Sequence, residues 1–360
     1  MSRPLRAEID LEALRANLRR VRHVAPYARV MAAIKANAYG HGVVPVAQAL
    51  GHDVEGLAVA CLEEALELRD TGVVVPILLL EGCLDVAELV EAARRDLSIV
   101  VHCEDQLCML EKARLEHPTP VWLKINTGMN RLGIEPGMAS AFHARLAALG
   151  ADRVTVLATH LAEADDREAT TTIRQLRCFD ETIAGLGGPQ SIANSAAILD
   201  RPDTHRDWVR PGIMLYGASP FADSVGVDEG LVPVMTLSSA LIAIRDCCAG
   251  EAIGYGGDWR CPEAMRVGVV AIGYGDGYPR HARSGTPVLI RNRRAPLVGR
   301  VSMDMLTVDL REVPDAAVGD EVVLWGRDLP VEAVAESAGT ISYELFCRLT
   351  RRVPVSYRNG

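Results

Sequence analysis

The chain has 360 residues, which is enough for one barrel-sized domain and a smaller second domain. Hydrophobic residues make up 49% of it, so a large core is available, and the formal net charge of -9 argues against nucleic acid as a partner because phosphate binding needs a basic surface. Nine irregularly spaced cysteines, without the short repeats of a zinc site, indicate reduced thiols and no bound metal.

No stretch of the sequence predicts a targeting or membrane segment. Charged residues stand among the first ten positions, where a signal peptide needs an apolar run. The best apolar run, Val73–Leu80, is broken by Pro76 and is far shorter than the ~20 residues of a membrane span. We therefore expect a cytoplasmic protein without a membrane partner.

Short apolar runs alternate with amphipathic helical stretches over the first two hundred residues. The opening helix is typical, because Asp10 can cap it and Leu11, Leu14 and Leu18 recur at helical spacing. Eight strands alternating with helices predict a closed (β/α)8 barrel, with an open doubly wound sheet as the alternative. The predicted strands are Val30–Lys35, Gly56–Cys61, Pro76–Glu81, Ser98–Cys103, Pro120–Asn126, Val154–His160, Ser191–Ser195 and Val209–Tyr216.

The pattern of apolar and polar residues changes after about Gly230. Helical periodicity fades, and short apolar runs are separated by Gly, Pro and Asp, which is typical of a β domain. These runs are Thr236–Ile244, Arg266–Ile272, Pro287–Ile290 and Glu321–Leu324. We therefore predict an α/β protein with a (β/α)8 barrel over residues 1–230 and a mostly β domain over residues 231–360.

Polar and basic residues mark the carboxyl ends of the predicted barrel strands. Lys35 closes the first strand, Lys124 lies near the end of the fifth, and His160 closes the sixth. Ser195 closes the seventh strand, and Arg210 lies in the eighth. Active sites of such barrels lie at this rim, so we expect these side chains to share one site.

Lys35 is the most informative of these residues. Burying an unpaired ammonium is costly, so this lysine either reaches solvent at the rim or stands in a partly dry pocket, where its pKa falls and it can attack a carbonyl. Phosphate sites in barrels often use the loops after strands seven and eight. There Ser195 offers a hydroxyl and the chain near Gly212 offers backbone N–H groups. A reactive lysine that faces a phosphate site indicates a pyridoxal-phosphate enzyme.

Four segments together resemble the alanine racemase family. They are Ile34–Gly42 (IKANAYGHG), Arg210–Gly217 (RPGIMLYG), Ile253–Gly257 (IGYGG) and Gly299–Met305 (GRVSMDM). The resemblance spans nearly the whole chain. It implies a barrel followed by a β domain, and an isomerase that interconverts L-alanine and D-alanine with pyridoxal 5'-phosphate as cofactor.

The resemblance implies two catalytic bases. Lys35 is expected to form the Schiff base with the cofactor and to act as one base, while Tyr255 is expected to act on the opposite face of the substrate. A free phenol has a pKa near ~10, and the family implies that a chain from Tyr255 through His160 to Arg210 supplies positive charge. Taken alone, Tyr255 is more typical of a glycine-flanked turn.

The resemblance also implies the contacts of the cofactor. Arg210 is expected to meet the pyridine nitrogen, where its permanent charge disfavours protonation and so suppresses transamination. The phosphate is expected to be held by neutral donors, which come from Tyr39, Ser195, Tyr343 and the backbone of Gly212 and Ile213.

The substrate carboxylate is expected to bind Arg131, helped by the backbone N–H of Met303. Lys124 matches the position at which many family members carry a carbamylated lysine, and a carbamate there could orient Arg131. Asn126 departs from the family pattern, in which Asp is common at this place, and so changes the local charge near Lys124.

The resemblance further implies a homodimer with shared sites. Tyr255, Met303 and Asp304 are expected to reach each site from the partner subunit, and Tyr274 and Tyr343 to narrow its entrance for a small amino acid. Three alternatives remain: a decarboxylase of the same fold, which Arg210 disfavours; a non-catalytic cofactor carrier, which the second domain disfavours; and a racemase for serine or a wider range of amino acids. D-alanine supply for peptidoglycan and alanine catabolism both fit.

Overall fold

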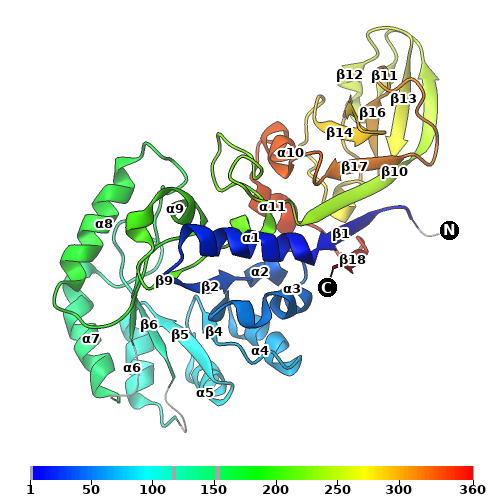
Figure 1. The fold of residues 1–360 in the computed structure, drawn as a ribbon. Helices are drawn as coiled ribbons and strands as arrows, with labels where there is room; N and C mark the ends of the chain where they lie inside the picture. Colours follow the sequence, from blue (N-terminus) through cyan, green and yellow to red (C-terminus); the bar gives the residue numbers. More distant parts are fainter. Residues whose placement is uncertain (1–2, 116–118, 151–154, 360) are drawn as a thin grey trace.

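The computed structural model describes residues 3–115, 119–150 and 155–359, and it contains a closed eight-stranded barrel and a β-rich second domain (Figure 1). The barrel strands pair in parallel and in chain order, and the last closes on the first. This confirms the predicted barrel and excludes the open sheet. The strands are β2 (Arg29–Ala33), β3 (Gly56–Val59), β4 (Ile77–Leu79), β5 (Leu97–Val101), β6 (Val121–Lys124), β7 (Val156–Ala158), β8 (Gln190–Ser191) and β9 (Trp208–Val209).

Helices surround the barrel, and the first of them is capped as the sequence predicts. The Asp10 carboxylate accepts hydrogen bonds from the backbone N–H groups of Glu12 and Ala13. Within the described residues, every helix is too short or too polar to cross a membrane. The helices of this domain are α1 (Leu11–Val24), α2 (Lys35–Tyr39), α3 (Val43–Leu50), α4 (Leu62–Asp70), α5 (Val86–Arg94), α6 (Glu104–Lys112), α7 (Ala139–Ala148), α8 (Thr170–Ile183) and α9 (Ser195–Asp200).

The barrel strands are shorter than the apolar runs that predict them. The predicted strand over Val209–Tyr216 ends at Val209, and a short 3-10 helix, η4 (Ile213–Tyr216), follows it. Pro211 has no N–H to continue a strand ladder, which explains the break. Lys35 and Ser195 do not close strands but begin α2 and α9, and Val154 lies outside the described residues.

The second domain is built around a sheet in the order β15-β14-β17-β10-β1-β18, to which β13 and β16 are joined through β10. Two short helices, α10 (Val331–Ala338) and α11 (Ser342–Cys347), return from it toward the barrel. The strands are β1 (Arg6–Asp10), β10 (Met235–Cys247), β11 (Ala252–Ile253), β12 (Trp259–Arg260), β13 (Met265–Val270), β14 (Pro287–Ile290), β15 (Arg293–Pro296), β16 (Leu306–Asp309), β17 (Glu321–Trp325) and β18 (Val355–Arg358).

The start of the chain belongs to this second sheet, although the sequence analysis places it with the barrel. β1 pairs antiparallel with β10 and parallel with β18, so both ends of the chain lie in one sheet (Figure 1). Five residues are too few to show a strand pattern distinct from the helix that follows. The remaining 3-10 turns are η1 (Gly51–Asp53), η2 (Pro136–Met138), η3 (Pro202–Thr204), η5 (Tyr255–Gly257) and η6 (Tyr274–Asp276).

Hydrogen bonds of the buried Asn17 and the half-buried Glu332 join the barrel to the second domain. Asn17 of α1 donates to the carbonyls of Leu215 and Val232 at 3.0 and 2.8 Å and accepts from the Val232 N–H at 2.7 Å. The Glu332 carboxylate of α10 accepts from the N–H groups of Ser219 and Gly226 at 2.8 and 2.9 Å. These bonds hold the 219–226 loop and α10 together over the carboxyl ends of the barrel strands.

Candidate active site

A cavity of about 920 Å³ lies at the carboxyl ends of the barrel strands and reaches the helices α10 and α11 of the second domain. Such a rim is where barrel enzymes place their chemistry. Ten of the residues singled out in the sequence line this cavity. Those that do are Lys35, Tyr39, Lys124, Arg131, His160, Ser195, Arg210, Gly212, Ile213 and Tyr343.

Lys35 enters the cavity from a left-handed turn. The residues from Ala36 to Tyr39 all have φ between 52 and 54°, a conformation that costs non-glycine residues roughly 1–2 kcal/mol each. Hydrogen bonds compensate: the Asn37 carboxamide accepts from the Val43 N–H at 2.8 Å, and the His41 imidazole bonds the Tyr39 carbonyl at 2.8 Å. The turn brings Lys35 and Tyr39 to the same cavity.

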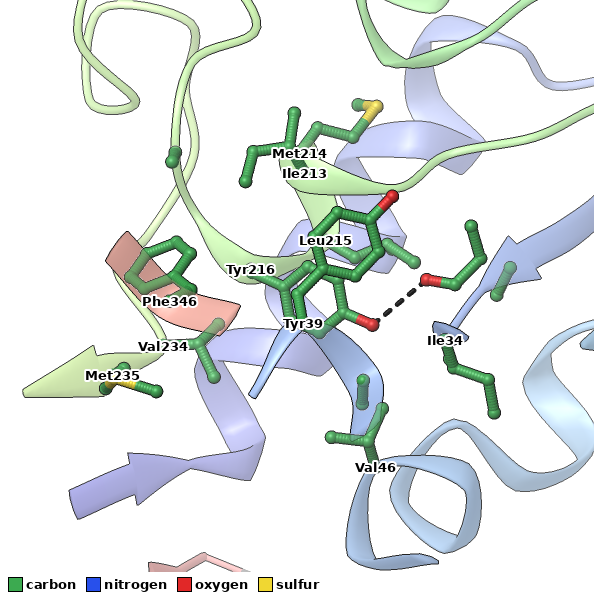
Figure 2. Close-up of a cluster of buried hydrophobic side chains, with 14 of the residues drawn as sticks. Ile34, Tyr39, Val46, Ile213, Met214, Leu215, Tyr216, Val234, Met235 and Phe346 are labelled. Carbon is green, nitrogen blue, oxygen red and sulfur yellow. Dashed lines mark hydrogen bonds between the residues drawn. The ribbon is translucent and has the colours of Figure 1, made fainter. Parts of the chain in front are cut away.

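The Tyr39 ring is fixed from behind by a buried tyrosine. The rings of Tyr39 and Tyr216 stack with their centroids 4.7 Å apart, and the Tyr216 hydroxyl donates to the Ala33 carbonyl at 3.0 Å (Figure 2). Burial raises the pKa of Tyr39 to about 12, so its hydroxyl keeps its proton and can donate. A Cβ on Gly212 would lie 2.5 Å from the Tyr39 hydroxyl oxygen, so only glycine leaves this space.

Ser195 and the chain after β9 meet beside Tyr39. The Ser195 hydroxyl oxygen accepts hydrogen bonds from the N–H groups of Gly212 and Met214 at 2.9 and 3.4 Å. The Tyr343 ring of α11 lies 6.0 Å from that of Tyr39, between centroids. Hydroxyls from three elements and the backbone at Gly212 therefore gather in one corner of the cavity, as the sequence predicts for a phosphate site.

Arg210 and His160 form a second, cationic corner. Arg210 donates to the Ser191 hydroxyl at 2.5 Å and to the carbonyls of Thr159 and Ile192 at 2.7 and 3.1 Å. It also contacts His160 Nδ1 at 3.3 Å. A guanidinium can only donate, so Nδ1 accepts and the His160 proton resides on Nε2. Burial and the Arg210 charge hold the pKa of His160 well below its usual range, so the ring is neutral.

Lys124 stands among other cations. Burial, then the charges of Arg210, Arg131 and Lys35, lower its pKa to about 8. A much larger fraction of this amine is neutral at pH 7 than of an exposed lysine. The neighbouring Asn126 turns away from it: its side-chain oxygen accepts from the N–H groups of Gly128 and Asn130, which builds the turn that leads to Arg131.

The predicted site residues of the second domain other than Tyr343, which include Tyr255 and Met303, do not line the cavity. Tyr255 is 70% exposed and lines a separate hollow of about 390 Å³, and Met303 is 53% exposed. Tyr274, expected at the entrance, does not line the cavity either and is 38% exposed. Hydrogen bonds from Tyr274 N–H to the Ser302 carbonyl and from Gly275 N–H to the Met303 carbonyl join these loops. The chain thus carries two sets of predicted site residues on different surfaces.

Several residues of the site escape the sequence analysis. Trp122, Asp165 and Cys347 line the cavity, and Ser191 and Tyr216 support Arg210 and Tyr39 from behind. Tyr216 stands inside one of the quoted family segments, so the motif itself contains the signal. The other residues can be identified only from the three-dimensional structure, because the residues that they contact are distant in the sequence.

Comparison with known proteins agrees with this arrangement. The family model described as "Alanine racemase, N-terminal domain" matches residues 9–220, and "Alanine racemase, C-terminal domain" matches residues 234–357. An alanine racemase from Thioalkalivibrio sulfidiphilus is 53% identical over 99% of both chains, and one from Nitrosococcus oceani is 54% identical over 97% of this chain and 98% of its own.

Solved structures extend the likeness to the fold. The biosynthetic alanine racemase of Pseudomonas aeruginosa superposes with a TM-score of 0.97 at 46% identity, covering 99% of this chain and all of that one. The alanine racemase of Acinetobacter baumannii gives 0.95 at 39% identity, again over 99% of this chain and all of its own. Sequence and fold agree over both domains: this chain belongs to the alanine racemase family of isomerases.

Proposed function

We propose that this protein interconverts L-alanine and D-alanine. The observation that carries the proposal is the single cavity in which Lys35 lies with the Arg210–His160 pair and a corner of neutral hydroxyl donors, in a chain of the alanine racemase family. The relatives named above act on alanine by their names, which favours alanine over serine as substrate.

The residues present fit pyridoxal 5'-phosphate. The hydroxyls of Tyr39, Ser195 and Tyr343 and the backbone at Gly212 and Ile213 would hold its phosphate, in the space that a Cβ at Gly212 would fill. Lys35 would hold its aldehyde carbon, and Arg210 would meet its ring nitrogen. When bound, the cofactor makes the Cα–H bond of an amino acid acidic enough for a side-chain base.

Two bases on opposite faces then exchange the proton at the substrate Cα. The Lys35 Nζ serves one face, and the Tyr255 hydroxyl oxygen serves the other. Because the His160 proton resides on Nε2, this ring can donate to the Tyr255 oxygen and stabilise it without its proton. Arg210 keeps His160 in that tautomer and disfavours its protonation.

Tyr255 lines a different hollow from the cavity that holds Lys35, so we propose that it reaches this cavity from another copy of the chain, in a homodimer with shared sites. In the single chain, the second domain exposes an apolar patch made of Tyr255, Tyr274, Met303 and Met305. A symmetric dimer that places this patch over the partner's barrel rim buries it and completes both sites at once. Tyr274 then narrows the entrance together with Tyr343.

Arg131 would bind the substrate carboxylate, and the backbone N–H of the partner-supplied Met303 would assist it. A carbamate on Lys124 would replace one of several crowded cations by an anion and orient Arg131. The lowered pKa of Lys124, about 8, supports this, since carbamylation needs the neutral amine. All nine cysteines are free thiols, which fits a reducing cytoplasm, and the biosynthetic relative favours D-alanine supply for peptidoglycan.

The test is a chiral assay of the purified protein loaded with pyridoxal 5'-phosphate and given L-alanine. We expect the wild type to form D-alanine and the Lys35→Ala variant to form none above background. Lys112→Ala removes an exposed lysine of α6 and should match the wild type. If the wild type forms D-serine from L-serine but no D-alanine, the alanine assignment fails.

A further inference from the structure

A buried glutamine outside the cavity joins two of the loops that supply its side chains. Gln175 lies on α8, on the outer layer of the barrel, and is 1% exposed. Its Nε2 donates to the His160 carbonyl at 3.0 Å and to the Thr127 hydroxyl at 3.2 Å, and its Oε1 accepts from the Ala162 N–H at 2.9 Å. Both of its N–H donors and its oxygen are therefore used.

The hydroxyl groups beyond Gln175 have only one consistent order. Thr159 Oγ1 donates its single proton to the Ile125 carbonyl at 2.9 Å, so it must accept from Thr127 Oγ1 at 2.8 Å. Thr127 has then used its own proton and can only accept from Gln175. The chain of bonds runs in one direction, from Gln175 to Thr127 to Thr159 to Ile125. This order fixes the amide orientation of Gln175.

These bonds connect the two loops at the ends of β6 and β7. The β6 loop contains Thr127 and, four residues later, Arg131; the β7 loop starts at Thr159, and His160 is its second residue. Gln175 also packs against the β6 loop, because a Cβ on Gly128 would lie 3.5 Å from the Gln175 Cγ. Neither Gln175 nor Thr127 lines the cavity, so their effect on it can only be indirect.

We infer that Gln175 is a positioning residue, which sets the distance between the carboxylate-binding Arg131 and the proton-relaying His160. The inference rests on the proposed function for the roles of those two side chains. Buried, fully satisfied polar networks specify one arrangement of the groups they join, and a displacement of about 1 Å at a reacting centre can cost about a hundredfold in rate.

The barrel offers a matched control. Gln106 of α6 is 5% exposed and makes the same kind of bridge between the ends of β4 and β5. Its Nε2 donates to the carbonyls of Glu81 and Cys83 at 3.0 and 3.3 Å, and its Oε1 accepts from the His102 N–H at 2.9 Å. The loops that it joins supply neither Arg131 nor His160.

The experiment compares Gln175→Met and Gln106→Met in the cofactor-loaded protein. Both changes keep the side-chain length and remove the hydrogen bonds, so we expect similar losses in melting temperature. The kinetics should differ: in Gln175→Met, KM for L-alanine should rise and kcat fall, each by about tenfold, while Gln106→Met stays within about twofold of the wild type. Gln175→Glu places acceptors where donors are needed and should lose more activity than Gln175→Met.

Binding of propionate, a carboxylate with the carbon skeleton of alanine but no amine, gives a readout that needs no turnover. By titration calorimetry, its Kd should rise in Gln175→Met by about the same factor as KM and stay unchanged in Gln106→Met. Equal kinetic effects in the two variants, or an unchanged propionate Kd in Gln175→Met, overturn the inference. A wild type that forms no D-alanine overturns the proposed function instead.

Discussion

The predicted site residues of the barrel and those of the second domain differ in how far they are exposed to solvent. In the barrel, Arg210, His160 and Tyr39 lie in a cavity, and each is held by hydrogen bonds or stacking from neighbouring segments of the chain. In the second domain, Tyr255 and Met303 stand on an exposed surface. The proposed dimer would account for this difference, because the exposed residues of the second domain would complete a site only against another copy of the chain.

This difference is what a site shared between two subunits would produce. Exposing apolar side chains such as Tyr255 and Met303 to water is unfavourable, and burying them against a partner would lower the free energy. The held side chains of the barrel need no further partner for stability. Burial therefore distinguishes the groups that we propose to bind the cofactor from the groups that we propose a partner subunit to deliver.

The largest expected effect on activity comes from dimers that contain two different inactive variants. Lys35→Ala and Tyr255→Phe should each be nearly inactive alone. If the two residues of one site come from different chains, a mixture that exchanges subunits regains roughly a quarter of the wild-type activity, because half of the dimers carry one intact site of two. A mixture that stays inactive although exchange is demonstrated, for example with a size tag on one variant, contradicts the shared site.

Gly212→Ala tests how tightly the barrel half is built. Its Cβ would lie 2.5 Å from the Tyr39 hydroxyl oxygen, and overpacking of this kind costs about 1–3 kcal/mol. We expect the Kd for pyridoxal 5'-phosphate to rise tenfold or more, measured by equilibrium dialysis. Gly187→Ala meets no atom within 4 Å and serves as the control. Adding Tyr39→Phe to Gly212→Ala should restore the melting temperature but not the cofactor affinity. If Gly212→Ala alone still binds the cofactor tightly, the residues around Gly212 can move to make room for the added Cβ.

The smallest expected effect is that of replacing Lys124 on the melting temperature, and this effect depends on pH. The folded state lowers its pKa from 10.5 to about 8, so the protonated amine destabilises the folded protein below pH 8. The penalty fades as pH rises from about 8 to 10.5. In carbonate-free buffer, Lys124→Met should therefore melt a few degrees above the wild type at pH 7 and nearly equal to it at pH 10.

The same pair of proteins reports on the carbamate. Adding bicarbonate at pH 7 to 8 should raise the melting temperature of the wild type toward that of Lys124→Met and leave the variant unchanged. If the pH dependence holds but bicarbonate does not change the melting temperature of the wild type, Lys124 is crowded by other cations but is not carbamylated.

The sequence predicts the barrel well because its signal is local. Each strand is an apolar run, and each following helix has its own periodicity, so eight units can be counted without knowledge of their contacts. The ends of the runs are less certain: Ile34 is apolar and buried but lies beyond β2, because the chain leaves the ladder at Ala33. Hydrophobicity reports burial, and burial does not require strand geometry.

The parts that sequence reasoning misses depend on contacts between distant residues. Nothing in the residues around Gln175 indicates that its amide joins two loops, since its partners Thr127 and His160 lie 48 and 15 residues away. The left-handed turn of Ala36–Tyr39 is hidden for another reason, because alanine normally favours right-handed helix. Family motifs identify such places, and the structure explains their geometry.

The pairing of β1 has a consequence for how the polypeptide matures during synthesis. β1 is synthesised well before its partners β10 and β18, which begin 229 and 349 residues after Arg6. The barrel can close while β1 still has no neighbour on either side, and an unpaired strand is a template for association with other nascent chains. The second sheet can be completed only after β18 has been synthesised, so this sheet closes later than the barrel.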